Sequence, residues 1–213
     1  MDWFVSDTHF NHSNIIRYCN RPFATAAEMD EVLLRNINRC VKPDDTLWHL
    51  GDFCFGPRDP EGFIRTATHY RNQISCRKVI LIHGNHDPDP NAWNREEREK
   101  GERFVKLFYE DYALRRTTIM GQKMTLCHYA MARWDKSHRG SINLYGHSHS
   151  DIEGWMESIM PGRRSLDVGV DNIAKLFGDY RPISFTELMQ IMNSRPGFRE
   201  HHGDRLAIRY RQA

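Results

Sequence analysis

Short apolar runs recur along the chain, and each is followed at once by polar or glycine residues. The runs lie at residues 3–5, 47–50, 79–82, 124–127 and 142–145. Brief apolar runs that end in turn-forming residues are typical of buried strands. The pattern therefore predicts five strands, each with a short polar motif directly after it.

Helical periodicity fills several of the intervals between these strands. Capping boxes at 25–28 and 184–187 place a hydroxyl residue three positions before a Glu, and apolar residues follow at helical spacing. Asp59 and the proline after it predict the start of another helix. The charged segment 91–108 predicts a helix or helix pair that is interrupted at Gly101.

The second half of the chain is richer in strands. Residues 114–120 and 123–127 flank Gly121-Gln122, which predicts a hairpin turn, and residues 165–170 predict a further strand. A β-α-β-α first half followed by a mostly antiparallel second half is typical of an α/β fold with two packed sheets and helices outside them. We expect that architecture in place of a simple Rossmann sheet.

The 213 residues are enough for one well-buried domain, and no linker divides them, so we expect a single domain over 1–213. Segment 151–164 is interpreted as an inserted hairpin or flap that could act as a lid or a dimer contact. The arginine-rich segment 195–213 is interpreted as a solvated basic tail in preference to a nucleic-acid contact. The oligomeric state is left open.

Charge and cysteine content narrow the classes of protein further. A net charge of +2 does not favour a polyanion binder, so a nucleic-acid partner is allowed but not favoured. The five cysteines are odd in number and lack CxxC spacing, which favours a reducing, cytoplasmic setting over a disulfide framework. A strand begins almost at Met1, and no apolar stretch approaches membrane-spanning length, so we expect neither a signal peptide nor a membrane partner.

The motifs after the strands are rich in carboxylate, amide and imidazole groups. In chain order they are Asp7-Thr8-His9, Gly51-Asp52, Gly84-Asn85-His86-Asp87, His128 and Gly146-His147-Ser148-His149. A mixed oxygen and nitrogen set without thiolate suits Mn²⁺, Fe or Zn²⁺ better than calcium or soft metals. Seven candidate ligands are too many for one tetrahedral ion and suit two ions that share a bridging carboxylate; they are Asp7, His9, Asp52, Asn85, His128, His147 and His149.

Two local features should bring these side chains together. Residues two apart in an extended segment project to the same side, so each Asp-x-His or His-x-His pair could face one centre. The glycines that precede Asp52, Asn85 and His147 should allow tight turns with unusual backbone angles. Two ions roughly 3.5 to 4 Å apart can bind the attacking and phosphoryl oxygens of a displacement at phosphorus, so hydrolysis of a phosphate ester is the expected use.

The five motifs together resemble the signature of the calcineurin-like metallophosphoesterase superfamily, which is DxH, GD, GNH followed by E or D, a lone H, and GHxH. The resemblance implies a β-sandwich flanked by helices, with two divalent metals at the carboxyl ends of the strands. It implies Mn²⁺, with Fe, Zn²⁺ or Ni²⁺ as alternatives. The implied ligands are Asp7, His9, Asp52 and His149 for one metal, and Asp52, Asn85, His128 and His147 for the other.

The same resemblance implies a mechanism. A hydroxide bridging the two metals would attack phosphorus, and Asp52 would bridge the ions. His86 would donate a proton to the leaving oxygen or stabilise charge on the phosphoryl group, and Asp87 would orient and charge His86. Both are therefore candidate catalytic residues.

Four further residues are candidates for substrate binding. His12 and Asn14 extend the first motif and could contact the phosphate or a base, although both could equally cap a short helix that begins near residue 13. Tyr129 and Arg133 follow His128 on a loop, where an aromatic ring and a guanidinium could select the substrate.

The sequence therefore predicts a metal-dependent phosphodiesterase acting on a small nucleotide or cyclic nucleotide. A phosphomonoesterase and a nuclease are the alternatives within enzymes. A binding module without catalysis is disfavoured, because His86 and all seven ligands are present. The compact chain leaves little room for DNA-binding additions, which disfavours the nuclease.

Overall fold

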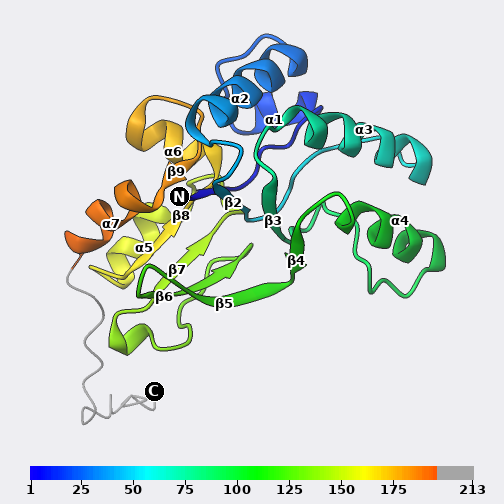
Figure 1. Cartoon of the computed structure of the whole chain (residues 1–213). Helices are drawn as coiled ribbons and strands as arrows, with labels where there is room; N and C mark the ends of the chain where they lie inside the picture. Colours follow the sequence, from blue (N-terminus) through cyan, green and yellow to red (C-terminus); the bar gives the residue numbers. More distant parts are fainter. Residues whose placement is uncertain (196–213) are drawn as a thin grey trace, which may run out of the picture.

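The computed structural model describes residues 1–195, so nearly all of the predicted basic tail lies outside the described residues. Its first sheet has the strand order β4-β3-β2-β1-β9 (Figure 1). Strands β1 (Asp2–Val5), β2 (Thr46–His49), β3 (Lys78–Ile82) and β4 (Glu110–Tyr112) pair in parallel, and β9 (Ile183–Ser184) is antiparallel to β1. The predicted strands of the first half are confirmed.

The second sheet has the order β5-β6-β7-β8, with bounds β5 (Leu114–Ile119), β6 (Gln122–Cys127), β7 (Ile142–Tyr145) and β8 (Ser165–Asp167). Only β5 and β6 are antiparallel; β6 to β7 and β7 to β8 are parallel pairs. The predicted mostly antiparallel half is therefore wrong. The long connections after β6 and β7 carry the chain back to the start of the next strand, which is what a parallel pair needs.

One apolar core lies between the two sheets. Phe4 and Ile80 from the first sheet pack in one buried cluster with Leu126 and Leu144 from the second. Helix α7 (Phe185–Asn193) adds Leu188 to the same cluster. The predicted two-sheet sandwich is confirmed.

A second core lies on the other face of the first sheet, where Leu47 and Val79 pack with Leu33 and Phe63 from the helices. This face is covered by α2 (Ala26–Cys40), α3 (Pro60–Gln73) and α4 (Arg95–Val105), and α1 (Ser13–Tyr18) contributes Ile15. Successive strand residues point to opposite faces, so one short strand can serve both cores. The remaining helices are η1 (Ser137–Arg139), α5 (Glu153–Ile159) and α6 (Val170–Phe177).

The predicted starts of three helices are confirmed. The Thr25 side chain accepts a hydrogen bond from the backbone of Glu28, Asp59 caps α3, and Ser184 forms a full capping box with Glu187. Within the described residues, no helix is both long enough and apolar enough to cross a membrane.

Two local predictions are corrected. The hairpin turn is Met120-Gly121, because Ile119 pairs with Gln122, and both turn residues have positive φ as a tight two-residue hairpin requires. Helix α4 continues through Gly101, where a side chain would approach the backbone of Asp89 to 2.4 Å. That glycine therefore allows close packing and does not interrupt the helix.

The second half differs from expectation in two further segments. The segment 151–164 contains helix α5 and not a hairpin. Within this helix Met156 is buried and Trp155 is exposed. The strand predicted at 165–170 ends at Asp167, since Val170 begins helix α6. Whether 151–164 acts as a flap stays a prediction.

Candidate metal centre

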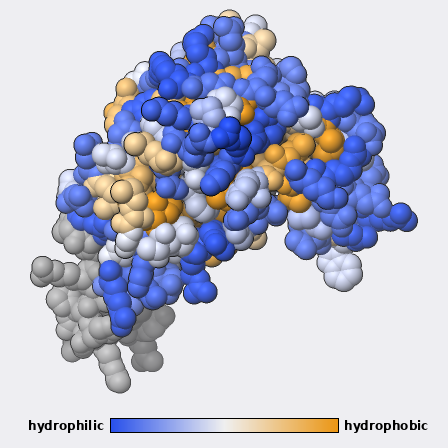
Figure 2. All heavy atoms as spheres, viewed as in Figure 1, coloured by the Kyte–Doolittle hydropathy of each residue, from blue (hydrophilic) through white to orange (hydrophobic). Residues whose placement is uncertain are grey.

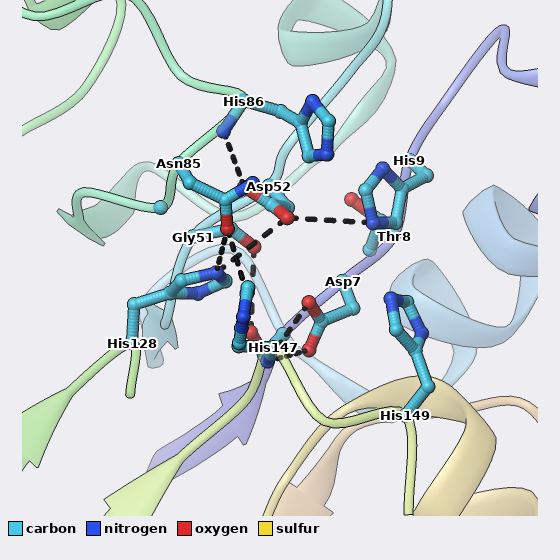
Figure 3. A network of polar contacts seen from close by, with 12 residues as sticks. Asp7, Thr8, His9, Gly51, Asp52, Asn85, His86, His128, His147 and His149 are labelled. Carbon is cyan, nitrogen blue, oxygen red and sulfur yellow. Dashed lines mark hydrogen bonds and ion pairs between the residues drawn. The ribbon is translucent and has the colours of Figure 1, made fainter. Parts of the chain in front are cut away.

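All five polar motifs meet at one end of the sandwich. They follow the carboxyl ends of β1, β2 and β3 in the first sheet and of β6 and β7 in the second. Figure 3 shows the side chains of these loops turned toward one another from the two sheets. The carboxyl ends of neighbouring parallel strands meet at one edge, which explains why residues so distant in the sequence converge.

The candidate ligands form two adjacent groups. Asp7, His9 and His149 have potential ligand atoms within 4.8 Å of one another, and Asp52, His128 and His147 form a second such group. Asn85 belongs with the second group, because its Oδ1 lies 2.7 Å from His147 Nδ1 and 3.1 Å from His128 Nε2. All seven predicted ligands are thus brought together.

Asp52 lies between the two groups. Its Oδ2 is 3.5 Å from the Nε2 atoms of both His9 and His128, one from each group. Its other oxygen, Oδ1, accepts a hydrogen bond of 2.8 Å from the backbone N–H of His86. A carboxylate in this position can face two ions at once.

The expectation that the Asp-x-His and His-x-His pairs lie in extended segments is wrong. Five of the seven candidate ligands have a left-handed backbone, with φ of 57° at Asp7, 48° at His9, 56° at Asp52, 67° at His147 and 46° at His149. The Asp-x-His and His-x-His pairs are therefore tightly turned and not extended. Asp, Asn and His tolerate this conformation better than other non-glycine residues, so the metal-binding residue types also suit the loops.

The glycines of the motifs act in two ways. Gly51 has φ of 98° and provides the unusual backbone angle that was expected. Gly84 and Gly146 serve close approach instead: a Cβ would lie 2.3 Å from Asp52 Oδ1 at Gly84 and 2.1 Å from Ser6 Oγ at Gly146. These two loops can reach the centre only because a side chain is missing there.

Burial and charge shift the pKa values of the site in opposite directions. Burial raises the pKa of Asp7 to about 7 against the lowering effect of His128. Burial also acts to raise the pKa of Asp52, but its hydrogen bond with His128 and the charges of His128 and His9 outweigh it and lower that pKa. Burial lowers the pKa of His9 well below its ordinary value.

These residues fit divalent cations. Both ring nitrogens of His9 are buried and have no hydrogen-bond partner among the described residues, although buried polar groups are normally paired. Beside them lie the carboxylates of Asp7 and Asp52, which are 0% and 2% exposed. A bound cation would give a ring nitrogen of His9 a partner, and its charge would offset the cost of burying the two carboxylates.

His149 is held by two residues that the sequence analysis missed. Its Nδ1 lies 2.6 Å from Asp171 Oδ2, and Arg21 binds Asp171 through Nε and Nη2, each at 2.8 Å. Arg21 also donates hydrogen bonds to the backbone carbonyls of Asp7 and Thr8. Arg21 thus ties the first loop of the centre to helix α6, which carries Asp171.

The burial of His149 would lower its pKa, but the hydrogen bond to Asp171 outweighs this and raises that pKa to about 11. Cys19 also lies within 4.8 Å of both residues. Cys19 is a free, partly buried thiol and is not among the seven candidate ligands. A carboxylate that holds the second nitrogen of a ligating histidine fixes the ring and its tautomer.

Replacing Asp171 by Asn should weaken metal binding by about 10- to 100-fold, because the carboxylate that orients His149 is lost. It should also lower the free energy of unfolding by about 3 kcal/mol, since Arg21 is left buried without its counter-charge. Metal titration and urea unfolding measure the two effects separately.

Asp179→Asn is the matched control for that change, because Asp179 pairs with the exposed Arg39 and belongs to neither ligand group. Neither quantity should change by more than a small amount in the control. If Asp171→Asn lowered stability alone and left metal affinity intact, Asp171 would support the fold without positioning His149.

Asp87 has a different contact set from the one expected. Its carboxylate accepts hydrogen bonds from the backbone N–H groups of Asp52, Phe53 and Gly84, at 2.9 to 3.0 Å. Among the described residues, none of its hydrogen bonds goes to the ring of His86. Asp87 therefore clamps two loops of the centre together, and its predicted orientation of His86 is corrected.

His86 extends from the same loop beside the first ligand group. Its ring centroid is 5.4 Å from that of His9 in an edge-on contact, and the residue is exposed (Figure 3). The ring is free to meet a substrate, whereas the backbone N–H is fixed to Asp52.

The four candidate substrate contacts separate into two places. His12 and Asn14 line a cavity of about 730 Å³ next to His9, His86 and His149. His12 is the first residue before α1 but makes no side-chain capping bond, so the capping alternative is not supported for it.

Tyr129 and Arg133 lie outside that cavity. The Tyr129 ring is 4.7 Å from the ring of His147, on the side of the second ligand group. Arg133 is exposed on the loop after β6, and that loop is anchored by a hydrogen bond from Trp134 Nε1 to Ser141. His83, which directly precedes the third loop, pairs with Asp111 at 2.7 Å.

Comparison with known proteins agrees with the fold and the site. The family model for calcineurin-like phosphoesterases matches residues 3–206, and the chain belongs to this family. It is accordingly a phosphoric ester hydrolase from a family that typically binds divalent metals.

The chain is also similar to individual proteins and to a solved structure. An uncharacterized protein of Methanocaldococcus jannaschii is 30% identical over 89% of this chain and 90% of its own length. The gene 66 protein of Mycobacterium phage L5 is 26% identical over 90% of this chain and 93% of its own. A crystal structure of a protein of unknown function from Aquifex aeolicus superimposes with a TM-score of 0.61 and 26% identity, covering 90% and 98% of the two chains.

Proposed function

We propose that this protein is a phosphodiesterase with a dinuclear metal centre, acting on a small nucleotide or cyclic nucleotide. The observation that carries the proposal is the position of Asp52 between two groups of ligand atoms. One group alone would serve a single ion. Two groups that share a carboxylate suit a pair of ions.

Asp7, His9, Asp52 and His149 would hold the first metal, and Asp52, Asn85, His128 and His147 the second. When bound, the two cations supply a strong nucleophile from water at neutral pH and neutralise charge on the phosphoryl oxygens. We propose Mn²⁺ as the ion, with Fe, Zn²⁺ or Ni²⁺ as alternatives; nitrogen and oxygen donors without thiolate suit this group of ions.

His86 acts on the substrate in this proposal. Its ring is exposed, lines the cavity and lies beside the first ligand group. It can donate a proton to the leaving oxygen or a hydrogen bond to the phosphoryl group, without being a metal ligand itself. Asp87 supports it indirectly by holding the loop backbone.

The charges around the cavity favour a diester over a monoester. Besides histidines, Lys175 is the single cationic residue among the described residues that line the cavity. Arg21 is buried and already paired with Asp171. A monoester dianion would be better served by a bidentate arginine close to the metals.

We take residues 1–213 as one catalytic domain that works in the cytoplasm. Its near-neutral charge is consistent with a small-molecule substrate in preference to a nucleic-acid polymer.

The deciding experiment compares bis-(p-nitrophenyl) phosphate with p-nitrophenyl phosphate, using protein stripped by a chelator and then resupplied with Mn²⁺. Metal-dependent cleavage of the diester is the expected result. Cleavage of the monoester alone would replace the phosphodiesterase by a phosphatase. Cleavage of neither compound by protein that holds two metals would contradict the proposal.

A further inference from the structure

The cavity beside the first ligand group is large for a phosphate alone. Its volume is about 730 Å³, within the range of roughly 300 to 1,000 Å³ that small-molecule sites occupy. His9, His86 and His149 form the wall nearest the metal centre. A phosphate held at the centre would therefore leave most of the cavity for the organic part of the ester.

Phe55 provides a flat apolar surface in this cavity. One face of its ring stacks on His12, with the centroids 4.4 Å apart and the planes at 17°. The residue is nevertheless 45% exposed, although its neighbours Phe53 and Cys54 are buried. The exposed area must belong to the other face and the edges, and Phe55 is among the residues that line the cavity.

The position of Phe55 is fixed by its backbone. Its N–H donates to the carbonyl of Phe10 at 2.8 Å, and its own carbonyl accepts a hydrogen bond from Asn11 Nδ2 at 3.0 Å. An exposed aromatic ring on a fixed backbone costs little conformational entropy when a ligand binds against it. It is a suitable surface for stacking.

Apart from Ile15, Cys19 and the rings of Tyr18 and Tyr180, the rest of the lining is polar. Asn14 and Asn20 offer amide groups, Lys175 offers one cation, and Ile15 is the single aliphatic residue in the lining among the described residues. A lipid tail would need an apolar lining, and a nucleic-acid polymer would need several cations along a groove. Amide groups around an aromatic surface instead match the edge and the face of a nucleobase.

We propose that this cavity binds the nucleobase of the substrate, stacked on Phe55, while the phosphate lies at the metal centre. The assignment rests on the proposed phosphoesterase function for the position of the phosphate. It identifies Phe55 as the residue that makes the enzyme prefer nucleotides over other phosphate esters.

The test measures binding of adenosine 5′-monophosphate and ribose 5-phosphate to the Mn²⁺-loaded protein by calorimetry. The two probes differ at the anomeric carbon of the ribose, which carries adenine in the first and a hydroxyl group in the second. The first should bind about tenfold more tightly, since stacking on an aromatic residue is worth that much or more. Phe55→Ala should abolish this ratio, whereas Phe55→Trp should keep it. If either monoester is cleaved, its KM replaces the dissociation constant.

Tyr109→Ala is the matched control, because Tyr109 is a similarly exposed aromatic residue outside the cavity. It should leave the ratio unchanged. Equal binding of the two probes to the unaltered protein would overturn the inference, and so would a Phe55→Ala protein that weakens both equally.

The two proposals fail separately. A protein that cleaves no diester but still prefers the adenosine compound would refute the phosphodiesterase and leave the base site standing. A protein that cleaves diesters but does not distinguish the two probes would refute the base site alone.

Discussion

Asp52→Asn should leave a folded protein that no longer holds two metals. The substitution keeps the size of the side chain and an oxygen that can accept the hydrogen bond from His86. It removes the negative charge that faces His9 and His128. Metal affinity should fall by at least about 100-fold, because even residues behind a ligand cost 10- to 100-fold.

At ordinary metal concentrations the catalytic activity of Asp52→Asn should fall by a larger factor than its metal affinity. The metals supply several kcal/mol of transition-state stabilisation, so kcat/KM should drop by about 10³-fold or more. Elemental analysis after gel filtration gives the metal content, and diester hydrolysis gives the rate. Full activity with unchanged metal content would contradict the bridging role.

Asp111→Asn is the matched control for this change. Asp111 also pairs with a histidine near the end of a strand, at 2.7 Å from His83, but it belongs to neither ligand group. Its replacement should change neither metal content nor rate. A similar loss of metal in both variants would point to a general loss of structure.

His86→Ala should separate chemistry from metal binding. The ring is removed, but the backbone N–H that holds Asp52 remains. We expect the metal content to stay at two ions per protein. For an ester with an alcohol leaving group, kcat should fall by about 10²- to 10⁴-fold.

The choice of leaving group distinguishes the two roles of His86. If His86 donates a proton, the loss should be much smaller for p-nitrophenolate, which leaves readily without one. If it stabilises the phosphoryl group, both esters should lose activity equally. His69→Ala, at an exposed surface histidine, should affect neither. A His86→Ala protein of normal activity on both esters would remove His86 from the mechanism.

Sequence patterns identified the strands and the polar motifs after them because both signals are local. Apolar runs ending in glycine or polar residues mark strand ends, and the seven candidate ligands that converge in the structure follow them. Helices with capping boxes were found for the same reason.

Contacts between distant parts of the chain could not be found in this way. Arg21 and Asp171 are 150 residues apart, and neither lies in a recognisable motif. The carboxylate of Asp87 bonds to backbone groups, which leave no trace in the sequence. The parallel pairing of β6 with β7 depends on how the intervening loop packs, and the short strands β4 and β9 exist only through their neighbours.

The left-handed residues of the metal centre have an evolutionary consequence. If Asp7, Asp52 and His147 ligate metal as proposed, a replacement must both ligate and tolerate a positive φ, which excludes β-branched residues. Glutamate and cysteine could ligate but would add backbone strain, and glycine would relieve the strain but cannot ligate. Substitutions that keep a ligand atom without adding backbone strain are thus confined to exchanges among Asp, Asn and His. Drift at these positions should therefore alter metal binding, as expected for Asp52→Asn, before it destroys the fold.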